Sequence, residues 1–160
     1  MADNLLEQVS ARLLAQNVTI AVAESCTGGL LGHWLTNVPG SSGYFLGGMI
    51  CYSTASKRDL LGVSDETIRR YGAVSGETAQ EMAARVRALF GANYALAITG
   101  IAGPAPGEAG EPVGLVYVGF ATATQALVES HHWTGSRIEN KESAARAALT
   151  LLLRHLQNEI

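Results

Sequence analysis

Residues 18–29, VTIAVAESCTGG, are the segment from which the fold of this chain can be worked out. The first six are apolar or β-branched, which is typical of a strand buried on both faces of a sheet. Residues 24–29 are small, hydroxylic or acidic, and a helical spacing of apolar residues begins at Leu30. A strand that enters a helix in this way is typical of α/β proteins, whose ligands bind beyond the carboxyl ends of the strands.

Helical and strand patterns continue to alternate on both sides of this segment. We expect helices at residues 4–16, 30–38, 54–61, 65–71, 75–90 and 140–158, and strands at 18–23, 44–52, 94–99, 113–121 and 126–133. The last two strands are separated by a short turn, which predicts an antiparallel hairpin. The sequence therefore predicts one domain over residues 1–160, an α/β fold of three layers (an α/β/α sandwich) on a mixed sheet.

The composition excludes several classes of protein. Of the 160 residues, 48% are hydrophobic and 16% are charged, which excludes a disordered chain. The net charge is −3 and no basic run occurs, so direct nucleic-acid binding is disfavoured. Neither a membrane span nor a signal peptide is evident, and two cysteines are too few for a disulfide framework. We therefore expect a cytoplasmic enzyme or small-molecule binder.

Three polar segments follow predicted strands, at residues 24–29, 52–57 and 99–104. If these strands are adjacent and parallel, the segments meet in one crevice. Ser25 then lies where a nucleophile would be useful, and the N–H groups at the helix start favour an oxyanion. Gly28 and Gly29 would let a ligand approach the backbone. The same residues also suit a helix N-cap followed by glycines for close packing, so the spacing leaves both interpretations open.

A serine nucleophile needs a base, and no histidine follows a strand beside small residues. A Ser-His-Asp triad is therefore not predicted. Lys57, near Tyr52, could act as a base if the crevice buries it, although an exposed helix lysine has the same pattern. Cys26 is a rival nucleophile, because a thiol at a helix N-terminus has a lowered pKa, although it has no visible base and a small buried cysteine is the commoner case. No metal-ligand spacing occurs, so no metal site is predicted.

The third segment and a later arginine could bind a phosphate group. Successive N–H groups between Thr99 and Gly103 could wrap an anion, as in a backbone nest. Arg137 could neutralise its charge. By itself, the Gly-x-x-Gly spacing of this segment is only weak evidence for a phosphate site.

Six motifs occur along the chain in a fixed order: AESCTGG (23–29), PGSS (39–42), CYSTASK (51–57), GAVS (72–75), TGIAGP (99–104) and PVGLVYV (112–118). Together they resemble the C-terminal domain of the CinA (competence/damage-inducible protein) family, over about residues 5–156. Each motif is common, whereas the ordered set is specific. The resemblance implies an amidohydrolase that converts nicotinamide mononucleotide to nicotinate mononucleotide and ammonia, without a cofactor.

The resemblance also implies roles for particular residues. It makes Ser25 the catalytic serine and Lys57 the catalytic lysine, with Tyr52 as a further site residue. Ser136 stands where the family usually has an acid, so the role of that acid is absent or replaced. The expected substrate-binding residues are Cys26, Thr27, Gly28, Gly29, Thr99, Gly100, Ile101, Ala102, Gly103 and Arg137.

We therefore expect Ser25 to attack a carboxamide carbon while Lys57 takes its proton, with N–H groups near Cys26, Thr27 and Gly28 holding the oxyanion. The expected partner is a small-molecule pyridine nucleotide, with neither nucleic acid nor membrane. Two alternatives stay open. One is a non-catalytic nucleotide-sensing or partner-binding module linked with competence, and the other is Ser-Lys chemistry on another small amide. The oligomeric state also stays open, with a homo-oligomer as one option.

Overall fold

The buried run at residues 18–23 forms the middle of the sheet, as β1 (Ile20–Glu24), and all five of its residues are buried. β1 lies between β2 (Phe45–Ile50) and β3 (Tyr94–Gly100) and runs parallel to both. β4 (Leu115–Ala121) and β5 (Ala126–His132) continue the sheet in antiparallel fashion, in the order β2-β1-β3-β4-β5. The predicted mixed sheet and its hairpin are confirmed in the computed structural model, which describes residues 2–158.

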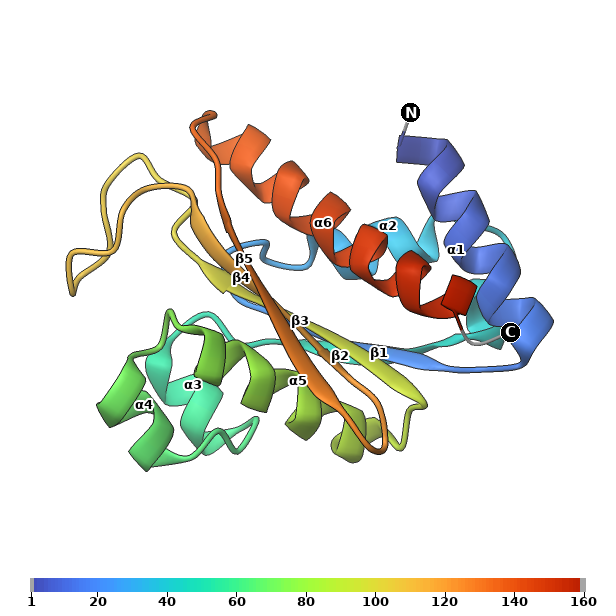
Figure 1. The fold of residues 1–160 in the computed structure, drawn as a ribbon, viewed down its shortest axis with the longest axis horizontal. Coiled ribbons are helices and arrows are strands. Elements are labelled where there is room, and N and C mark those ends of the chain that lie inside the picture. The colour runs from blue at the N-terminus through green and yellow to red at the C-terminus, as the bar shows by residue number, and fades with distance from the viewer. Residues whose placement is uncertain (1, 159–160) are drawn as a thin grey trace.

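Helices cover both faces of this sheet (Figure 1). On one face lie α1 (Ala2–Gln16), α2 (Leu30–Thr36) and α6 (Arg137–Asn158), and on the other lie α3 (Thr54–Asp59), α4 (Asp65–Tyr71) and α5 (Gly76–Phe90). Successive strand residues point to opposite faces, so each layer closes its own apolar core. Val22 and Leu96 belong to one core, whereas Ala23 and Ala97 belong to the other. The predicted α/β/α sandwich is confirmed.

α6 begins at Arg137, three residues before the predicted start. The Ser136 N–H donates to the Glu139 carboxylate at 2.7 Å, and the Glu139 N–H donates to the Ser136 hydroxyl at 3.4 Å. This reciprocal pair is a Ser-x-x-Glu capping box, which satisfies N–H groups at a helix start. Ser136 therefore caps the helix, as an acid at this position could do. Arg137 lies in the first turn of α6 rather than in a loop.

Two strands begin later than predicted, β1 at Ile20 and β4 at Leu115. Gly114, just before β4, has φ +85°, which is outside the strand region and favours glycine. Its N–H donates to the Ile101 carbonyl at 2.7 Å. The connection between β3 and β4 is thus tied back to its own beginning.

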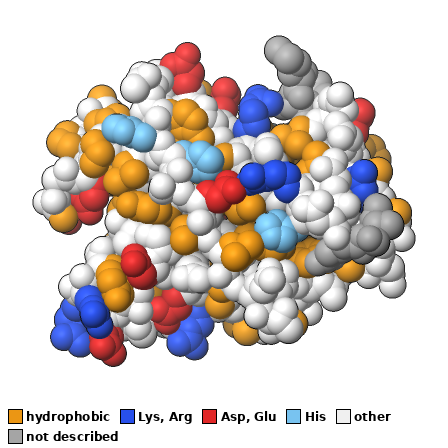
Figure 2. Space-filling view, in the orientation of Figure 1, with side chains coloured by type: hydrophobic (Ala, Val, Ile, Leu, Met, Phe, Trp, Pro, Cys, Tyr) orange, Lys and Arg blue, Asp and Glu red, His pale blue; other side chains and the backbone are white. Residues whose placement is uncertain are grey.

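Charged side chains are interspersed on the face of the molecule that Figure 2 shows, with acidic and basic groups side by side. Within residues 2–158, no helix combines the length and the apolar character that crossing a membrane requires.

Candidate active site

The carboxyl ends of the three parallel strands meet at one edge of the sheet, as the sequence predicted. β1 leads into Ser25, β2 into residues 51–57 and β3 into residues 101–104. A cleft of ≈ 620 Å³ opens there, within the size range of small-molecule sites. Its lining includes Ser25, Cys26, Tyr52, Lys57, Gly100, Ile101, Ala102, Gly103 and Arg137.

Lys57 and Ser25 form a hydrogen-bonded pair in this cleft. Lys57 Nζ lies 2.8 Å from Ser25 Oγ, although 32 residues separate them in the sequence. Nζ also donates to the carbonyl oxygens of Cys51 at 2.9 Å and Tyr52 at 3.2 Å. A neutral amine has two N–H bonds and one lone pair. The two carbonyls can take both N–H bonds, which leaves the lone pair for the proton of the Ser25 hydroxyl.

Burial favours the neutral form of Lys57. Its side chain is 2% exposed, and burial lowers its pKa from the ordinary value of 10.5, because a charged ammonium loses solvation in the interior. α3 holds the side chain in place, since the Ser53 hydroxyl caps this helix by accepting the Ser56 N–H at 3.0 Å. At a given pH, a larger fraction of Lys57 is therefore able to accept a proton.

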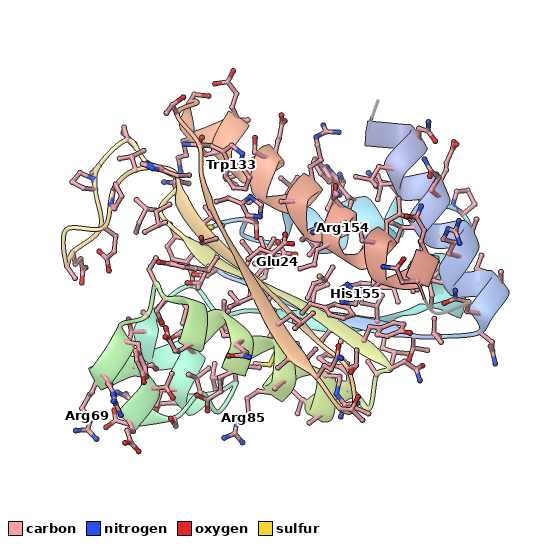
Figure 3. The ribbon with its side chains drawn as sticks, in the orientation of Figure 1. Glu24, Arg69, Arg85, Trp133, Arg154 and His155 are labelled. Atoms are coloured by element: carbon pink, nitrogen blue, oxygen red, sulfur yellow. The ribbon has the colours of Figure 1, made fainter. Side chains whose placement is uncertain are left out.

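Glu24 organises the turn that carries Ser25. It is 1% exposed and lies in the interior between the sheet and the helices above it (Figure 3). Its carboxylate accepts the N–H groups of Gly29 at 3.1 Å, Leu31 at 3.1 Å and Gly32 at 2.8 Å. The expectation that the N–H groups at the start of α2 are free for a substrate anion is therefore wrong. The protein's own carboxylate already occupies them.

One N–H group beside Ser25 remains available to an oxyanion in the cleft. The Gly28 N–H, expected in this role, donates to the Ser25 carbonyl at 3.0 Å instead. Within residues 2–158, the N–H groups of Cys26 and Thr27 donate to no other residue, and the Cys26 N–H interacts with its own thiol. Cys26 follows Ser25 directly and lines the cleft, whereas Thr27 does not, so the Cys26 N–H is the donor that the turn can offer to a developing negative charge.

Glu24→Gln should destabilise the fold. A neutral amide has one acceptor oxygen where the carboxylate has two, and its NH₂ group would face N–H donors. We expect the free energy of unfolding to fall by about 2 kcal/mol, the typical contribution of hydrogen bonds to a buried charge. Urea denaturation measures this change. Glu7→Gln, at an exposed position of α1, is the matched control and should stay within about 0.5 kcal/mol of the parent chain. Equal stabilities of the two variants would contradict the role of Glu24.

Arg137 joins two sides of the cleft. Its guanidinium donates to the Gly103 carbonyl at 2.5 Å and to the Tyr52 hydroxyl at 3.0 Å. Tyr52 is 60% exposed, and its backbone carbonyl is one of the two that hold Lys57. The first turn of α6 thus connects the lysine segment with the loop after β3.

The whole chain can be compared with known proteins. Residues 2–156 match the family described as the CinA C-terminal domain. The chain belongs to this family. A competence-damage inducible protein of Moorella thermoacetica is 48% identical over 156 residues, which are 97% of this chain and 38% of that protein. A CinA-like protein of Thermotoga neapolitana is 42% identical over 158 residues, which are 98% of this chain and 38% of that protein. The chain therefore spans less than half the length of these relatives.

Solved structures of related proteins have the same fold as this CinA domain over nearly its whole length. A competence damage-inducible protein A from Klebsiella pneumoniae has a TM-score of 0.96 at 32% identity, covering 99% of both chains. The competence/damage inducible protein CihA from Agrobacterium tumefaciens has a TM-score of 0.92 at 36% identity, covering 98% of this chain and 96% of its own. The resemblance that the six motifs indicated is confirmed.

Cys26 of this CinA domain is a poor nucleophile, which agrees with the interpretation of a small buried cysteine rather than with that of a reactive thiol. The residue is 6% exposed, and burial raises its pKa to about 11. Its thiol is therefore protonated at neutral pH, and Glu24 occupies the helix N-terminus that would have favoured a thiolate. Of the two neighbouring candidates, Ser25 is the one with a base.

Four of the expected substrate-binding residues do not line the cleft of the CinA domain: Thr27, Gly28, Gly29 and Thr99. Thr99 is fully buried, and its hydroxyl donates to the Ala73 carbonyl at 2.8 Å. It therefore positions residues 72–74, which line the cleft and for which we predicted no role. The GAVS motif at 72–75 was the available signal. Glu108 and Glu111, on the connection between β3 and β4, also line the cleft.

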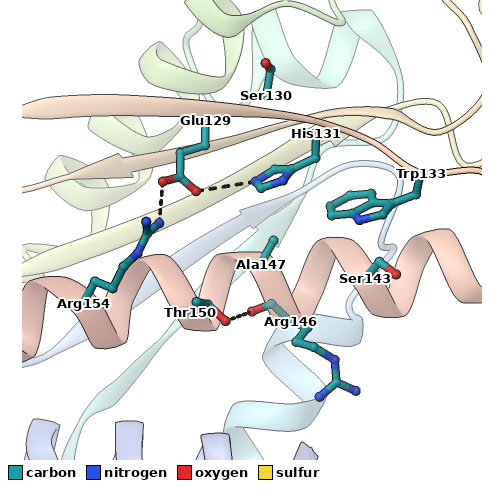
Figure 4. A pocket seen from close by; sticks show the side chains of 9 residues that line it. All are labelled: Glu129, Ser130, His131, Trp133, Ser143, Arg146, Ala147, Thr150 and Arg154. Atoms are coloured by element: carbon teal, nitrogen blue, oxygen red, sulfur yellow. Dashed lines mark hydrogen bonds and ion pairs between the residues drawn. The ribbon is translucent and has the colours of Figure 1, made fainter.

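A second hollow of ≈ 630 Å³ lies between β5 and α6 (Figure 4). The Glu129 carboxylate lies between Arg154, with which it forms an ion pair, and the His131 ring at 3.5 Å. Trp133 stacks on that ring, with 4.8 Å between the two centroids. No serine or cysteine in this hollow has a lysine partner like Lys57, so we assign the candidate active site of the CinA domain to the first cleft.

Proposed function

We propose that this chain is an amidohydrolase that removes the amide nitrogen of nicotinamide mononucleotide, giving nicotinate mononucleotide and ammonia. The observation that carries the proposal is the buried Lys57 Nζ at 2.8 Å from Ser25 Oγ, inside a cleft of ≈ 620 Å³. A hydroxyl in contact with a desolvated amine is the arrangement that nucleophilic catalysis without histidine requires. The choice of substrate follows from the CinA-type motifs.

In the first half of the reaction, Ser25 Oγ attacks the carboxamide carbon as its proton passes to Lys57 Nζ. The carbonyl oxygen becomes an oxyanion, which the Cys26 N–H stabilises. When the tetrahedral intermediate collapses, the carbon–nitrogen bond breaks. The leaving nitrogen takes the proton from Lys57 and departs as ammonia, and an ester to Ser25 remains.

In the second half, water attacks the ester carbon and gives a proton to Lys57. The ester bond breaks, Ser25 Oγ takes the proton back from Lys57, and the carboxylic acid product gives its own proton to water or to the released ammonia and leaves as a carboxylate. Lys57 thus acts as base and then as acid in each half, which a neutral amine of lowered pKa can do. The positive pyridinium ring of the substrate makes its amide carbon more electrophilic. Arg137 and the N–H groups of the loop after β3 are the groups available to the substrate phosphate.

The test is ammonia release by the purified chain from nicotinamide mononucleotide, measured beside nicotinamide riboside and free nicotinamide. We expect the nucleotide to be hydrolysed with the highest kcat/KM. If the folded chain binds the nucleotide and releases no ammonia, the alternative of a non-catalytic nucleotide-sensing module is favoured. If only another small amide is hydrolysed, the Ser-Lys chemistry stands and the substrate assignment is wrong.

A further inference from the structure

Three consecutive carbonyl groups of the loop after β3 are held by the protein. The Ile101 carbonyl accepts the Gly114 N–H at 2.7 Å. The Ala102 carbonyl accepts the side-chain amide of Asn140 at 3.0 Å, and the Gly103 carbonyl accepts the Arg137 guanidinium at 2.5 Å. The acceptor side of this loop is therefore fully engaged, and α6 supplies two of the three donors.

The N–H groups of Ala102 and Gly103 in the same loop point the other way from these carbonyl groups. In a planar trans peptide, the C=O of one residue and the N–H of the next point in opposite directions. The Ala102 N–H therefore points away from Gly114, and the Gly103 N–H points away from Asn140. Neither N–H donates to a group within residues 2–158, although both residues are buried and line the cleft. Because both residues line the cleft, these two N–H groups are donors of the loop that an anion bound in the cleft can reach.

The Asn140 side chain holds the peptide between Ala102 and Gly103 in this orientation. It is 1% exposed and lies outside the lining of the cleft. Its amide accepts the Gly135 N–H at 3.1 Å and donates to the carbonyls of Gly135 and Ala102, both at 3.0 Å. One side chain thus ties the turn before α6 to the peptide between Ala102 and Gly103.

We propose that Asn140 is a positioning residue, which holds the peptide between Ala102 and Gly103 with its N–H toward the cleft and so creates a binding position for a phosphate group. If this peptide turned over, the Ala102 carbonyl would face the anion and repel it. That the phosphate belongs to a mononucleotide substrate rests on the proposed function. The binding of a phosphate anion by the loop does not.

Two variants test the role of Asn140. Asn140→Leu keeps nearly the same size and loses all three hydrogen bonds. Asn140→Asp keeps an acceptor for the Gly135 N–H and, when ionised, loses both donors, so it serves if the leucine variant does not fold. Leu152→Ala is the control, because it weakens the buried side of the same helix without touching the loop. Binding of inorganic phosphate is measured by NMR titration, and kcat and KM are measured with nicotinamide mononucleotide and nicotinamide riboside.

We expect both Asn140 variants to bind inorganic phosphate about tenfold or more weakly, as expected for the loss of a hydrogen bond to a charged group. KM for the nucleotide should rise by a similar factor with kcat nearly unchanged, and the values for the riboside should not change. Leu152→Ala should leave phosphate binding and all four constants unaltered. Unchanged phosphate binding in the variants, or no binding in the parent chain, would overturn the proposal. So would an equal loss of kcat/KM for the nucleotide and the riboside. Because phosphate binding needs no turnover, an inactive parent chain would contradict only the proposed function.

Discussion

Ser25→Ala should lower kcat/KM for amide hydrolysis by about 10⁴-fold or more, because no acyl-enzyme can form without the hydroxyl. The fold should change little. The substitution removes one oxygen, and we expect the free energy of unfolding to stay within about 1 kcal/mol of the parent value. Steady-state ammonia release and urea denaturation measure the two effects on the same preparation.

Cys26→Ala is the matched control for this prediction. The Cys26 thiol is protonated at neutral pH, and only its backbone N–H has a role in the mechanism, so most of the activity should remain. Intact-mass spectrometry with a slow amide substrate should show an acyl adduct on the parent chain and on Cys26→Ala, and none on Ser25→Ala. An inactive, unlabelled Cys26→Ala beside a labelled Ser25→Ala would assign the chemistry to the thiol.

Lys57→Met should lower kcat by about 10²–10⁴-fold, the usual contribution of a general base. Methionine keeps most of the unbranched side chain, so the packing of this buried position of α3 is largely preserved. In the parent chain, kcat/KM should rise with pH through the lowered pKa of Lys57, because the amine must be neutral to take the serine proton. The residual activity of Lys57→Met should lack that rise. A variant within tenfold of the parent chain, with the same pH profile, would remove lysine from the mechanism.

The same lowered pKa makes stability depend on pH. Between the folded-state pKa of Lys57 and its ordinary value of 10.5, the unfolded chain binds a proton that the folded chain does not. The free energy of unfolding of the parent chain should therefore rise with pH across this window. Lys57→Met has no such group, so its stability relative to the parent chain should be highest at low pH and should decline as pH rises. Parallel stability curves for the two chains would contradict a lowered pKa.

The sequence predicted those features that depend on residues close together along the chain. Apolar spacing placed every described strand and α-helix to within about three residues. The residues after β1 and β2 made Ser25 and Lys57 candidates, and their catalytic roles were implied only by the resemblance to the CinA family. The pairing of these two side chains could be predicted only on the assumption that β1 and β2 are adjacent and parallel, since 32 residues separate them. The start of α6 could have been predicted correctly, because Ser136 and Glu139 have the spacing of a capping box.

Glu24 and Asn140 could not be predicted in the same way. An acid beside a nucleophile has many possible roles, and nothing in the spacing shows that Glu24 caps α2 from the interior. Asn140 lies 38 residues from Ala102, and its function depends on a contact that only the folded chain creates. The structure also shows why the rule of a lowered thiol pKa does not apply to Cys26. The rule for a thiol at a helix start assumes a free helix N-terminus, and here a buried carboxylate occupies it.

The carboxylate of Glu24 has a consequence for the end of the catalytic cycle. In the proposed reaction, hydrolysis converts an uncharged amide beside Ser25 into a carboxylate, one residue from the buried carboxylate of Glu24. Burial is the main cause of the raised pKa of the Cys26 thiol in this turn, and the Glu24 carboxylate adds to it while Lys57 opposes it. The product carboxylate and the Glu24 carboxylate therefore repel each other once the acid is formed. We expect the acid to dissociate readily. As a competitive inhibitor, it should bind more weakly than the amide does.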